Sequence, residues 1–134
     1  MLHILLIDDN SANFDITSEA ISMSTLKAEL DYVNSGELAL QYLERQGQYS
    51  DRPRPTLILL DLNMPGMNGF DVLKRLKSDP RFATIPVLML SSSDRPDDEE
   101  EAYRCNASCF ITKQDRIDDF VAVLQAVGTL WNHQ

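Results

Sequence analysis

Two hydrophobic patterns alternate along the chain. One consists of short, mostly apolar runs that end in polar or turn residues, which is typical of strands buried on both faces of a sheet. In the other, apolar residues recur every three or four positions, as they do on the buried face of a helix. The first pattern predicts strands over residues 3–7, 26–33, 57–60, 87–90 and 108–112. The second predicts helices over residues 11–23, 37–46, 68–79, 97–105 and 117–131.

The order of these elements indicates a parallel sheet. Each strand is followed by a helix, and every connection between strands is too long for a hairpin, so the strands run in the same direction. Such sheets are covered by helices on both faces, and their ligands bind at the carboxyl ends of the strands. Polar residues that directly follow a strand are therefore the first candidates for a functional site.

Carboxylates directly follow two of the apolar runs. Asp8 and Asp9 come after residues 3–7, and Asp61 comes after residues 57–60. If these strands are neighbours, they lie roughly 4.8 Å apart and the three acids crowd one edge of the sheet. Crowded carboxylates repel one another unless a cation is present. Their oxygens suit Mg²⁺, which binds one or two carboxylates and takes a phosphate oxygen as well. The sequence therefore predicts a Mg²⁺ site with an aspartate beside it.

Length and composition exclude several classes of protein. With 134 residues, of which 43% are hydrophobic, the chain can form one core, and we expect a single domain over residues 1–134. No apolar run approaches a membrane span and no cleavable signal is recognisable, so we expect a cytoplasmic protein without membrane contact. The net charge of −9 argues against direct nucleic-acid binding. Cys105 and Cys109 lack metal-binding spacing and are expected to be free thiols.

Helix starts and helix packing supply further local predictions. Ser11 is expected to cap the first helix and Ser35 the second, because serine hydroxyls accept the unpaired N–H groups of a helix start. The acids at residues 97–101 suit the positive end of a helix dipole. That helix has a thin apolar stripe, with little beyond Ala102 and Tyr103, so we expect it to be the most loosely packed.

Residues at the ends of four predicted strands also match a known family. Asp8 with Asp9, then Asp61, Ser91 and Lys113, together resemble the site of the receiver domains of two-component response regulators. The stretch that begins at Asp61 reads D-L-N-M-P-G-M-N-G and resembles the D-x-x-M-P-x-x-x-G stretch of that family. The resemblance covers the whole chain. It implies a flavodoxin-like (βα)5 doubly wound fold, a five-stranded parallel sheet of order 2-1-3-4-5, and no attached output domain.

The resemblance implies that the protein is a phosphoacceptor. Asp61 would take a phosphoryl group from the phosphohistidine of a sensor histidine kinase. The protein would assist its own phosphorylation and dephosphorylation rather than act as an enzyme on other substrates. Asp9 would bind Mg²⁺ directly and Asp8 largely through water, while Asp61 and the backbone carbonyl of Asn63 would be further ligands.

Three other residues take roles through the same resemblance. Lys113 would pair with Asp61 and then with the phosphoryl oxygens, and Ser91 would donate a hydrogen bond to the phosphoryl group. Phe110 would reorient its ring in response. The added group carries about −1.5 to −2 charges, which should bias the thinly packed helix nearby. The expected output face consists of residues 97–105, 108–112 and 117–131.

Other features depart from the family pattern or narrow it. Gln114 follows Lys113 where receivers generally carry a cis-proline, and a cis bond before a non-proline residue costs roughly 3–4 kcal/mol. Either this bond is trans and the loop differs, or strain is stored beside the site. The long loop over residues 47–56, the missing proline and Trp131 are similar to regulators paired with bacterial phytochromes. That similarity implies a phytochrome-type kinase as phosphodonor and a homodimer formed through the output face or the last helix.

Three other functions compete with the receiver. A flavodoxin-type electron carrier would need a Ser/Thr/Gly-rich loop after the first strand, and Asp8 and Asp9 would repel the phosphate of its FMN. A phosphohydrolase of the haloacid dehalogenase type uses D-x-D, but Asn63 stands where the second acid would be. A receiver-like module that binds partners without phosphorylation is disfavoured because the acids, Ser91 and Lys113 are all present.

Overall fold

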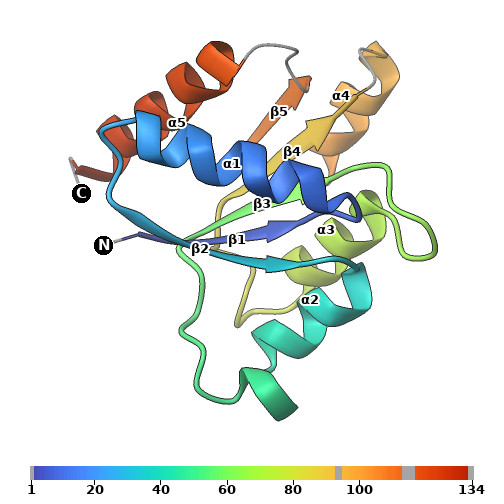
Figure 1. The fold of residues 1–134 in the computed structure, drawn as a ribbon. Coiled ribbons are helices and arrows are strands. Elements are labelled where there is room, and N and C mark those ends of the chain that lie inside the picture. The colour runs from blue at the N-terminus through green and yellow to red at the C-terminus, as the bar shows by residue number, and fades with distance from the viewer. Residues whose placement is uncertain (1, 93–94, 113–116, 133–134) are drawn as a thin grey trace.

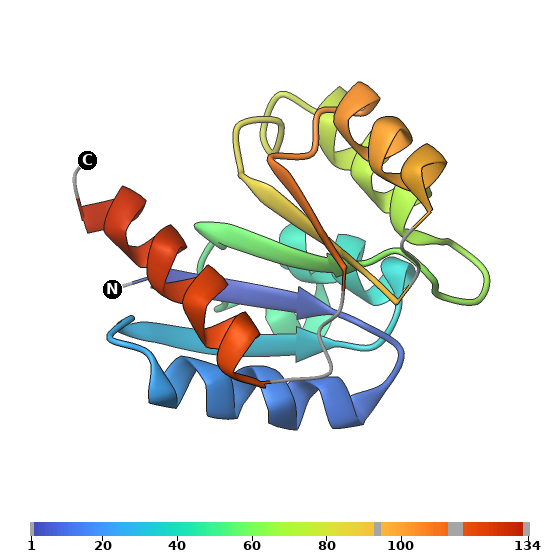
Figure 2. The same cartoon turned by 90° about the horizontal axis from the view of Figure 1, so that it is seen from above.

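A five-stranded parallel sheet with helices on both faces forms the protein (Figures 1 and 2), in a computed structural model that describes residues 2–92, 95–112 and 117–132. The strands are β1 (Leu2–Ile7), β2 (Ala28–Val33), β3 (Leu57–Asp61), β4 (Val87–Ser91) and β5 (Cys109–Thr112). The helices are α1 (Ser11–Met23), α2 (Gly36–Leu43), α3 (Gly69–Ser78), α4 (Pro96–Arg104) and α5 (Ile117–Asn132). The predicted strands and helices are confirmed with shifts at their ends, and a short 3₁₀ helix (Gly47–Tyr49) lies in the predicted loop.

The strands lie in the order β2-β1-β3-β4-β5, and every neighbouring pair is parallel, which confirms the predicted fold class. The chain passes from β1 to β2 at one edge, returns to β3 on the other side of β1, and then continues outward to β5. The winding direction therefore reverses between β1 and β3. Their carboxyl ends, at the right of Figure 1, flank the switch point at which ligands bind in sheets of this type.

The central strands are apolar on both sides because successive side chains of a strand point to opposite faces of the sheet. In β3, Ile58 and Leu60 belong to the core that includes residues of α2, α3 and α4. Leu57 and Leu59 belong to the core that includes residues of α1 and α5. All four side chains are fully buried. Two separate cores thus explain an aliphatic run that shows no alternation.

Side-chain caps begin the first two helices, and one of them corrects a prediction. Ser35 caps α2 as predicted, since its hydroxyl accepts the N–H of Leu38 at 3.1 Å. The cap of α1 is Asn10, whose side-chain oxygen accepts the N–H of Ala12 at 3.0 Å. The prediction of Ser11 was wrong because Ser11 is already the first helical residue, and asparagine is an equally good cap.

Contact between α4 and the rest of the protein is thin, as predicted. Ala102 is the one buried residue within α4, and Tyr103 is 45% exposed. The Tyr103 hydroxyl accepts the backbone N–H of Phe110 in β5 at 3.1 Å, which ties the last turn of α4 to the outer strand of the sheet. Cys105 and Cys109 are free, half-buried thiols, as predicted. None of the helices in the described ranges is long and apolar enough to cross a membrane.

Candidate functional site

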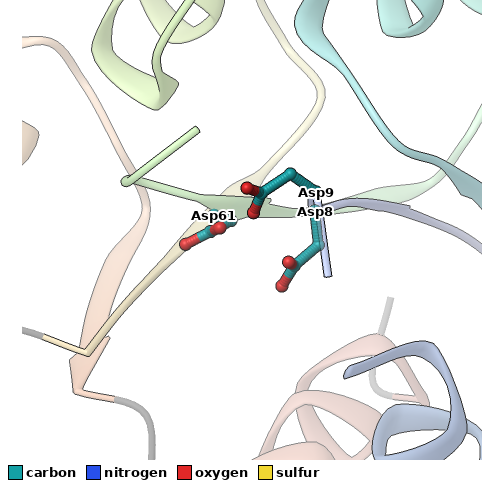
Figure 3. A group of neighbouring side chains, drawn as sticks. All are labelled: Asp8, Asp9 and Asp61. Carbon is teal, nitrogen blue, oxygen red and sulfur yellow. The ribbon is translucent and has the colours of Figure 1, made fainter. Parts of the chain in front are cut away.

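Three carboxylates meet at the switch point of the sheet (Figure 3). Asp8 directly follows β1 and Asp61 ends β3. These strands are neighbours, and Ile7 pairs with Leu60. The residues that follow this pair, Asp8 and Asp61, therefore lie side by side at the carboxyl end of the sheet. One carboxylate oxygen from each of Asp8, Asp9 and Asp61 lies within 4.8 Å of the others. The predicted acidic cluster is confirmed.

The three acids differ in their access to solvent. Asp8 is 0% and Asp61 3% exposed, whereas Asp9 is an exposed residue. Two buried carboxylates close together repel each other strongly, because little water screens their charges. The exposed Asp9 completes the cluster on its solvent side. The arrangement therefore combines a strong negative potential with an open approach for a cation.

Asp8 is held by hydrogen bonds to both its side chain and its backbone. The N–H of Asn10 donates to one carboxylate oxygen at 2.9 Å, and the side-chain amide of Asn13 donates to the other at 3.0 Å. The backbone carbonyl of Asp8 accepts the hydroxyl of Tyr32 at 2.7 Å, and its N–H donates to the carbonyl of Val33 at 3.2 Å. Asp8 is consequently fixed in place before any ion is bound.

Asp61 is positioned by the loop that follows it. The N–H of Asn63 lies 3.3 Å from Asp61 Oδ1, and the N–H of Gly69 donates to the carbonyl of Leu62 at 3.0 Å. The loop can close this tightly because Gly69 has no side chain: a Cβ there would lie 2.5 Å from the carbonyl oxygen of Asp61. Gly66 supplies the turn with a φ of +71°, a conformation that other residues rarely adopt. The close approach at Gly69 and the positive φ at Gly66 explain why residues 61–69 carry glycine at these two positions.

The remaining predicted residues are distributed as follows. Ser91 ends β4 and is fully buried, one residue beyond Leu90, which pairs with Asp61. Phe110 lies half-buried in β5 and packs against the core that includes α4. Asn63 is exposed beside Asp61. The predictions for Lys113 and for its bond to the next residue lie outside the described residues.

Two residues that sequence reasoning missed complete the surroundings of the acids. Asn13 bonds the Asp8 carboxylate from the first turn of α1, and its spacing of five residues after the acid could have indicated this. Tyr32 reaches Asp8 from β2, and no local signal indicates a contact across 24 residues. Burial, followed by the nearby charges of Asp8 and Asp9, raises the pKa of Tyr32. The phenol therefore remains protonated and can donate.

The chemistry of the cluster fits a hard divalent cation. The grouped side chains are all carboxylates, with no histidine or cysteine among the described residues of the group. Oxygen ligands of this kind favour Mg²⁺, Mn²⁺ or Ca²⁺ over softer metals. A divalent ion would also remove the repulsion between the buried acids. The residues present thus suit the ion that the sequence predicts.

A 2-1-3-4-5 sheet with an acidic cluster at its switch point and a buried serine at the end of the next strand defines a receiver-type α/β domain. Comparison with known families agrees: the model for the response regulator receiver domain matches residues 4–125. The chain belongs to this family, and it is a receiver domain of the two-component type. The flavodoxin and haloacid dehalogenase alternatives are therefore wrong.

Several relatives are similar over nearly the whole chain. Response regulator Rcp1 of Synechocystis sp. is 36% identical over 128 residues, which cover 96% of this chain and 87% of Rcp1. The crystal structure of the Mn²⁺-bound form of Rcp1 superimposes with a TM-score of 0.85 at 35% identity, covering 98% of this chain and 94% of that chain. The structure of the phosphorylated cyanobacterial phytochrome response regulator RcpA gives a TM-score of 0.86 at 37% identity, covering 97% and 93%. The predicted resemblance to phytochrome-associated regulators is thereby confirmed.

Proposed function

We propose that this receiver is a phosphorylation-controlled switch in which Asp61 accepts a phosphoryl group from a sensor histidine kinase in a Mg²⁺-dependent reaction. One observation carries the proposal: Asp61 ends a central strand, is buried, and shares a cluster of close carboxylate oxygens with Asp8 and Asp9. The similar proteins Rcp1 and RcpA, solved with Mn²⁺ and in a phosphorylated form respectively, support it.

The chemistry required of Asp61 is a nucleophilic displacement at phosphorus. A carboxylate oxygen of Asp61 attacks the phosphorus, the P–N bond of the phosphohistidine breaks, and its electron pair returns to the imidazole, leaving an acyl phosphate on the receiver. The Asn63 N–H orients the Asp61 carboxylate for this attack. The buried Ser91 hydroxyl, at the end of the neighbouring strand, is suited to donate to the transferred group.

The ion would be held by the acidic cluster. We assign direct binding to Asp9 because its carboxylate is exposed, and water-mediated binding to Asp8 because both of its carboxylate oxygens already accept hydrogen bonds. Asp61 and the backbone carbonyl of Asn63 would be the further ligands. When bound, Mg²⁺ neutralises charge on the reacting oxygens. Lys113 would supply the second positive charge, as the family resemblance implies.

The response would appear on α4, β5 and α5. An acyl phosphate adds about −1.5 to −2 charges. This charge would arise near Ser91, and Phe110 would respond on the adjacent strand. Because α4 buries a single alanine, a small change in its packing has a low cost. The switched face would bind a second copy of the chain or a downstream protein. All residues of β5 are half-buried, so this strand still has surface that a partner could cover.

The phosphodonor would be a histidine kinase of the bacterial phytochrome type. Two similar structures are named as phytochrome response regulators: RcpA, at 37% identity, and the bacteriophytochrome response regulator AtBRR, at 32%. We further propose that the protein works in the cytoplasm and turns over no external substrate. Transfer of phosphate from a purified phytochrome-type kinase, compared with a kinase from an unrelated system, tests the choice of donor.

Phosphorylation itself is tested with acetyl phosphate and Mg²⁺. The intact protein should gain one phosphate mass, and peptide mapping should locate it on Asp61. Asp61→Asn should gain none, whereas Asp15→Asn, which alters an exposed acid of α1, should behave as the wild type. A chelator should abolish the gain. Label on another residue, or none in the wild type, would contradict the proposal and favour a module that acts without phosphorylation.

A further inference from the structure

The peptide bond between Asp8 and Asp9 is held by a tyrosine from another strand. The Tyr32 hydroxyl donates to the backbone carbonyl of Asp8 at 2.7 Å. Tyr32 lies in β2 opposite Leu6 of β1, so its side chain extends along the neighbouring strand to the acidic end. Its ring packs edge-on against Phe14 of α1, with centroids 5.5 Å apart and planes at 73°. The ring contact limits where the hydroxyl can point.

Asp9 depends on this peptide more than Asp8 does. The Asp8 carboxylate is fixed by Asn10 and Asn13. Within the described part of the chain, no hydrogen bond holds the exposed Asp9 carboxylate, so the part of its placement that is fixed is the direction in which the backbone projects its Cβ. The Asp8 N–H is bound to Val33 and the Asp8 carbonyl to Tyr32, so two successive residues of β2 fix the backbone from which Asp9 projects.

We propose that Tyr32 is a positioning residue for the metal: its hydroxyl fixes the Asp8–Asp9 peptide so that the Asp9 carboxylate already faces Asp8 and Asp61 when the ion arrives. The proposal rests on the proposed function in that it requires the cluster to bind Mg²⁺. Groups that orient a ligand typically change metal affinity about 10- to 100-fold when they are removed. Tyr32 acts through the backbone, and it touches neither the ion nor the phosphoryl group.

The decisive variant is Tyr32→Phe, which removes the hydroxyl and keeps the ring that packs against Phe14. We expect the dissociation constant for Mg²⁺ to rise about tenfold, measured by titration of the purified protein with Mg²⁺ in a calorimeter. With acetyl phosphate as donor, the Mg²⁺ concentration for half-maximal phosphorylation should rise by the same factor. The rate at saturating Mg²⁺ should stay at the wild-type value, because the hydroxyl does not take part in the transfer.

Tyr42→Phe is the matched control. Tyr42 is buried, and its hydroxyl also donates to an aspartate, but that partner is Asp31 and the ring belongs to the core that includes α2. Its loss should lower stability and leave Mg²⁺ affinity unchanged. If Tyr32→Phe and the wild type bind Mg²⁺ with equal affinity, the inference is overturned. The proposed function would remain intact in that case, because the wild type still binds Mg²⁺. Failure of the wild type to bind Mg²⁺ would overturn both.

A measurement on the wild type keeps the inference testable if Tyr32→Phe does not fold. In NMR spectra, the Tyr32 hydroxyl proton should exchange slowly with water both before and after Mg²⁺ is added, because the hydrogen bond exists before the ion binds. A Tyr32 hydroxyl proton that becomes protected only when Mg²⁺ is present would overturn the inference.

Discussion

Tyr42 is a buried phenol whose environment favours its protonated form. Its hydroxyl donates to Asp31, which Arg52 also contacts at 3.4 Å, and its ring lies 5.3 Å from that of Tyr49. Burial and then the hydrogen bond to Asp31 raise its pKa above the usual value of 10.0. These contacts join β2, α2 and the loop after α2, so the ionisation of one hydroxyl affects three segments.

The raised pKa of Tyr42 predicts that the protein loses stability in alkaline solution. Because its pKa is raised in the folded protein, the unfolded chain releases this proton first, and the stabilisation is fully present below about pH 10 and lost as the pH rises above it. The urea midpoint should therefore fall between about pH 9.5 and about pH 11, and it should fall less steeply for Tyr42→Phe. Identical slopes for the two proteins would contradict this assignment.

Gly69 is the residue whose replacement should disturb Asp61 most directly. An added Cβ would lie 2.5 Å from the Asp61 carbonyl oxygen and 2.7 Å from Leu62 Cα, and neither backbone atom can move without shifting the strand end. Gly69→Ala should lower the free energy of unfolding by about 1–3 kcal/mol and weaken Mg²⁺ binding. Urea denaturation and a Mg²⁺ titration measure the two effects.

Gly66→Ala serves as the control for that experiment. Its φ of +71° is strained for alanine, but the nearest atom to an added Cβ is Glu37 Oε1 at 3.8 Å. We expect a conformational cost of about 1–2 kcal/mol without a collision at Asp61. If Gly66→Ala weakens Mg²⁺ binding as much as Gly69→Ala does, the close approach of Gly69 to Asp61 is not the cause.

At the scale of elements, α4 is held to the sheet by few contacts. Ala102 is buried, and the Tyr103 hydroxyl accepts the Phe110 N–H at the outer edge of β5. This bond joins the helix that is expected to respond to phosphorylation with the strand that carries Phe110. The same bond occupies the backbone N–H of Phe110 in β5, which is an edge strand of the sheet. Without it, this N–H could pair with a strand of another chain.

Tyr103→Phe should loosen this connection. A hydrogen bond of this kind contributes about 1 kcal/mol, so the amide of Phe110 should exchange with solvent roughly fivefold faster. The amides of β1 and β3, which lie in the centre of the sheet, should exchange as in the wild type. Unchanged protection of Phe110 in a hydrogen-exchange measurement would show that the hydroxyl does not hold this edge.

At the scale of the whole molecule, the acidic cluster links metal binding to stability. Asp8, Asp9 and Asp61 lie together in a protein of net charge −9, so their repulsion opposes folding when no cation is present. An ion that binds only the folded state stabilises it, by about 2.7 kcal/mol at 100 times its dissociation constant. Function and stability are therefore expected to respond to the same ion.

Removal of Mg²⁺ should consequently lower the melting temperature, and its return should restore it. Asp9→Asn should lose most of this response, because a carboxylate that the ion needs is missing. In the absence of metal, Asp9→Asn should melt above the wild type, since one source of repulsion has been removed. Calorimetric scans with a chelator and with excess Mg²⁺ test both statements, and an equal Mg²⁺ response in the two proteins would contradict them.

The sequence by itself determined the kind and order of the elements and the residues at the strand ends. Burial on two sheet faces produces unbroken apolar runs such as residues 57–60, and burial on one helix face produces spacing of three or four residues. These signals are local, so they survive without knowledge of the fold. The acids at the carboxyl ends of β1 and β3 could be recognised for the same reason, and the strand order followed from the family resemblance.

Only the tertiary structure decided which distant groups support the acids. The bond from Tyr32 to Asp8 depends on the register of β1 with β2, and the contact of Gly69 with Asp61 depends on how the loop closes. Asn10 rather than Ser11 caps α1 because the helix begins at Ser11, one residue earlier than a cap at Ser11 would require. Such contacts arise when packing brings separate segments together, and no local spacing in the chain encodes them.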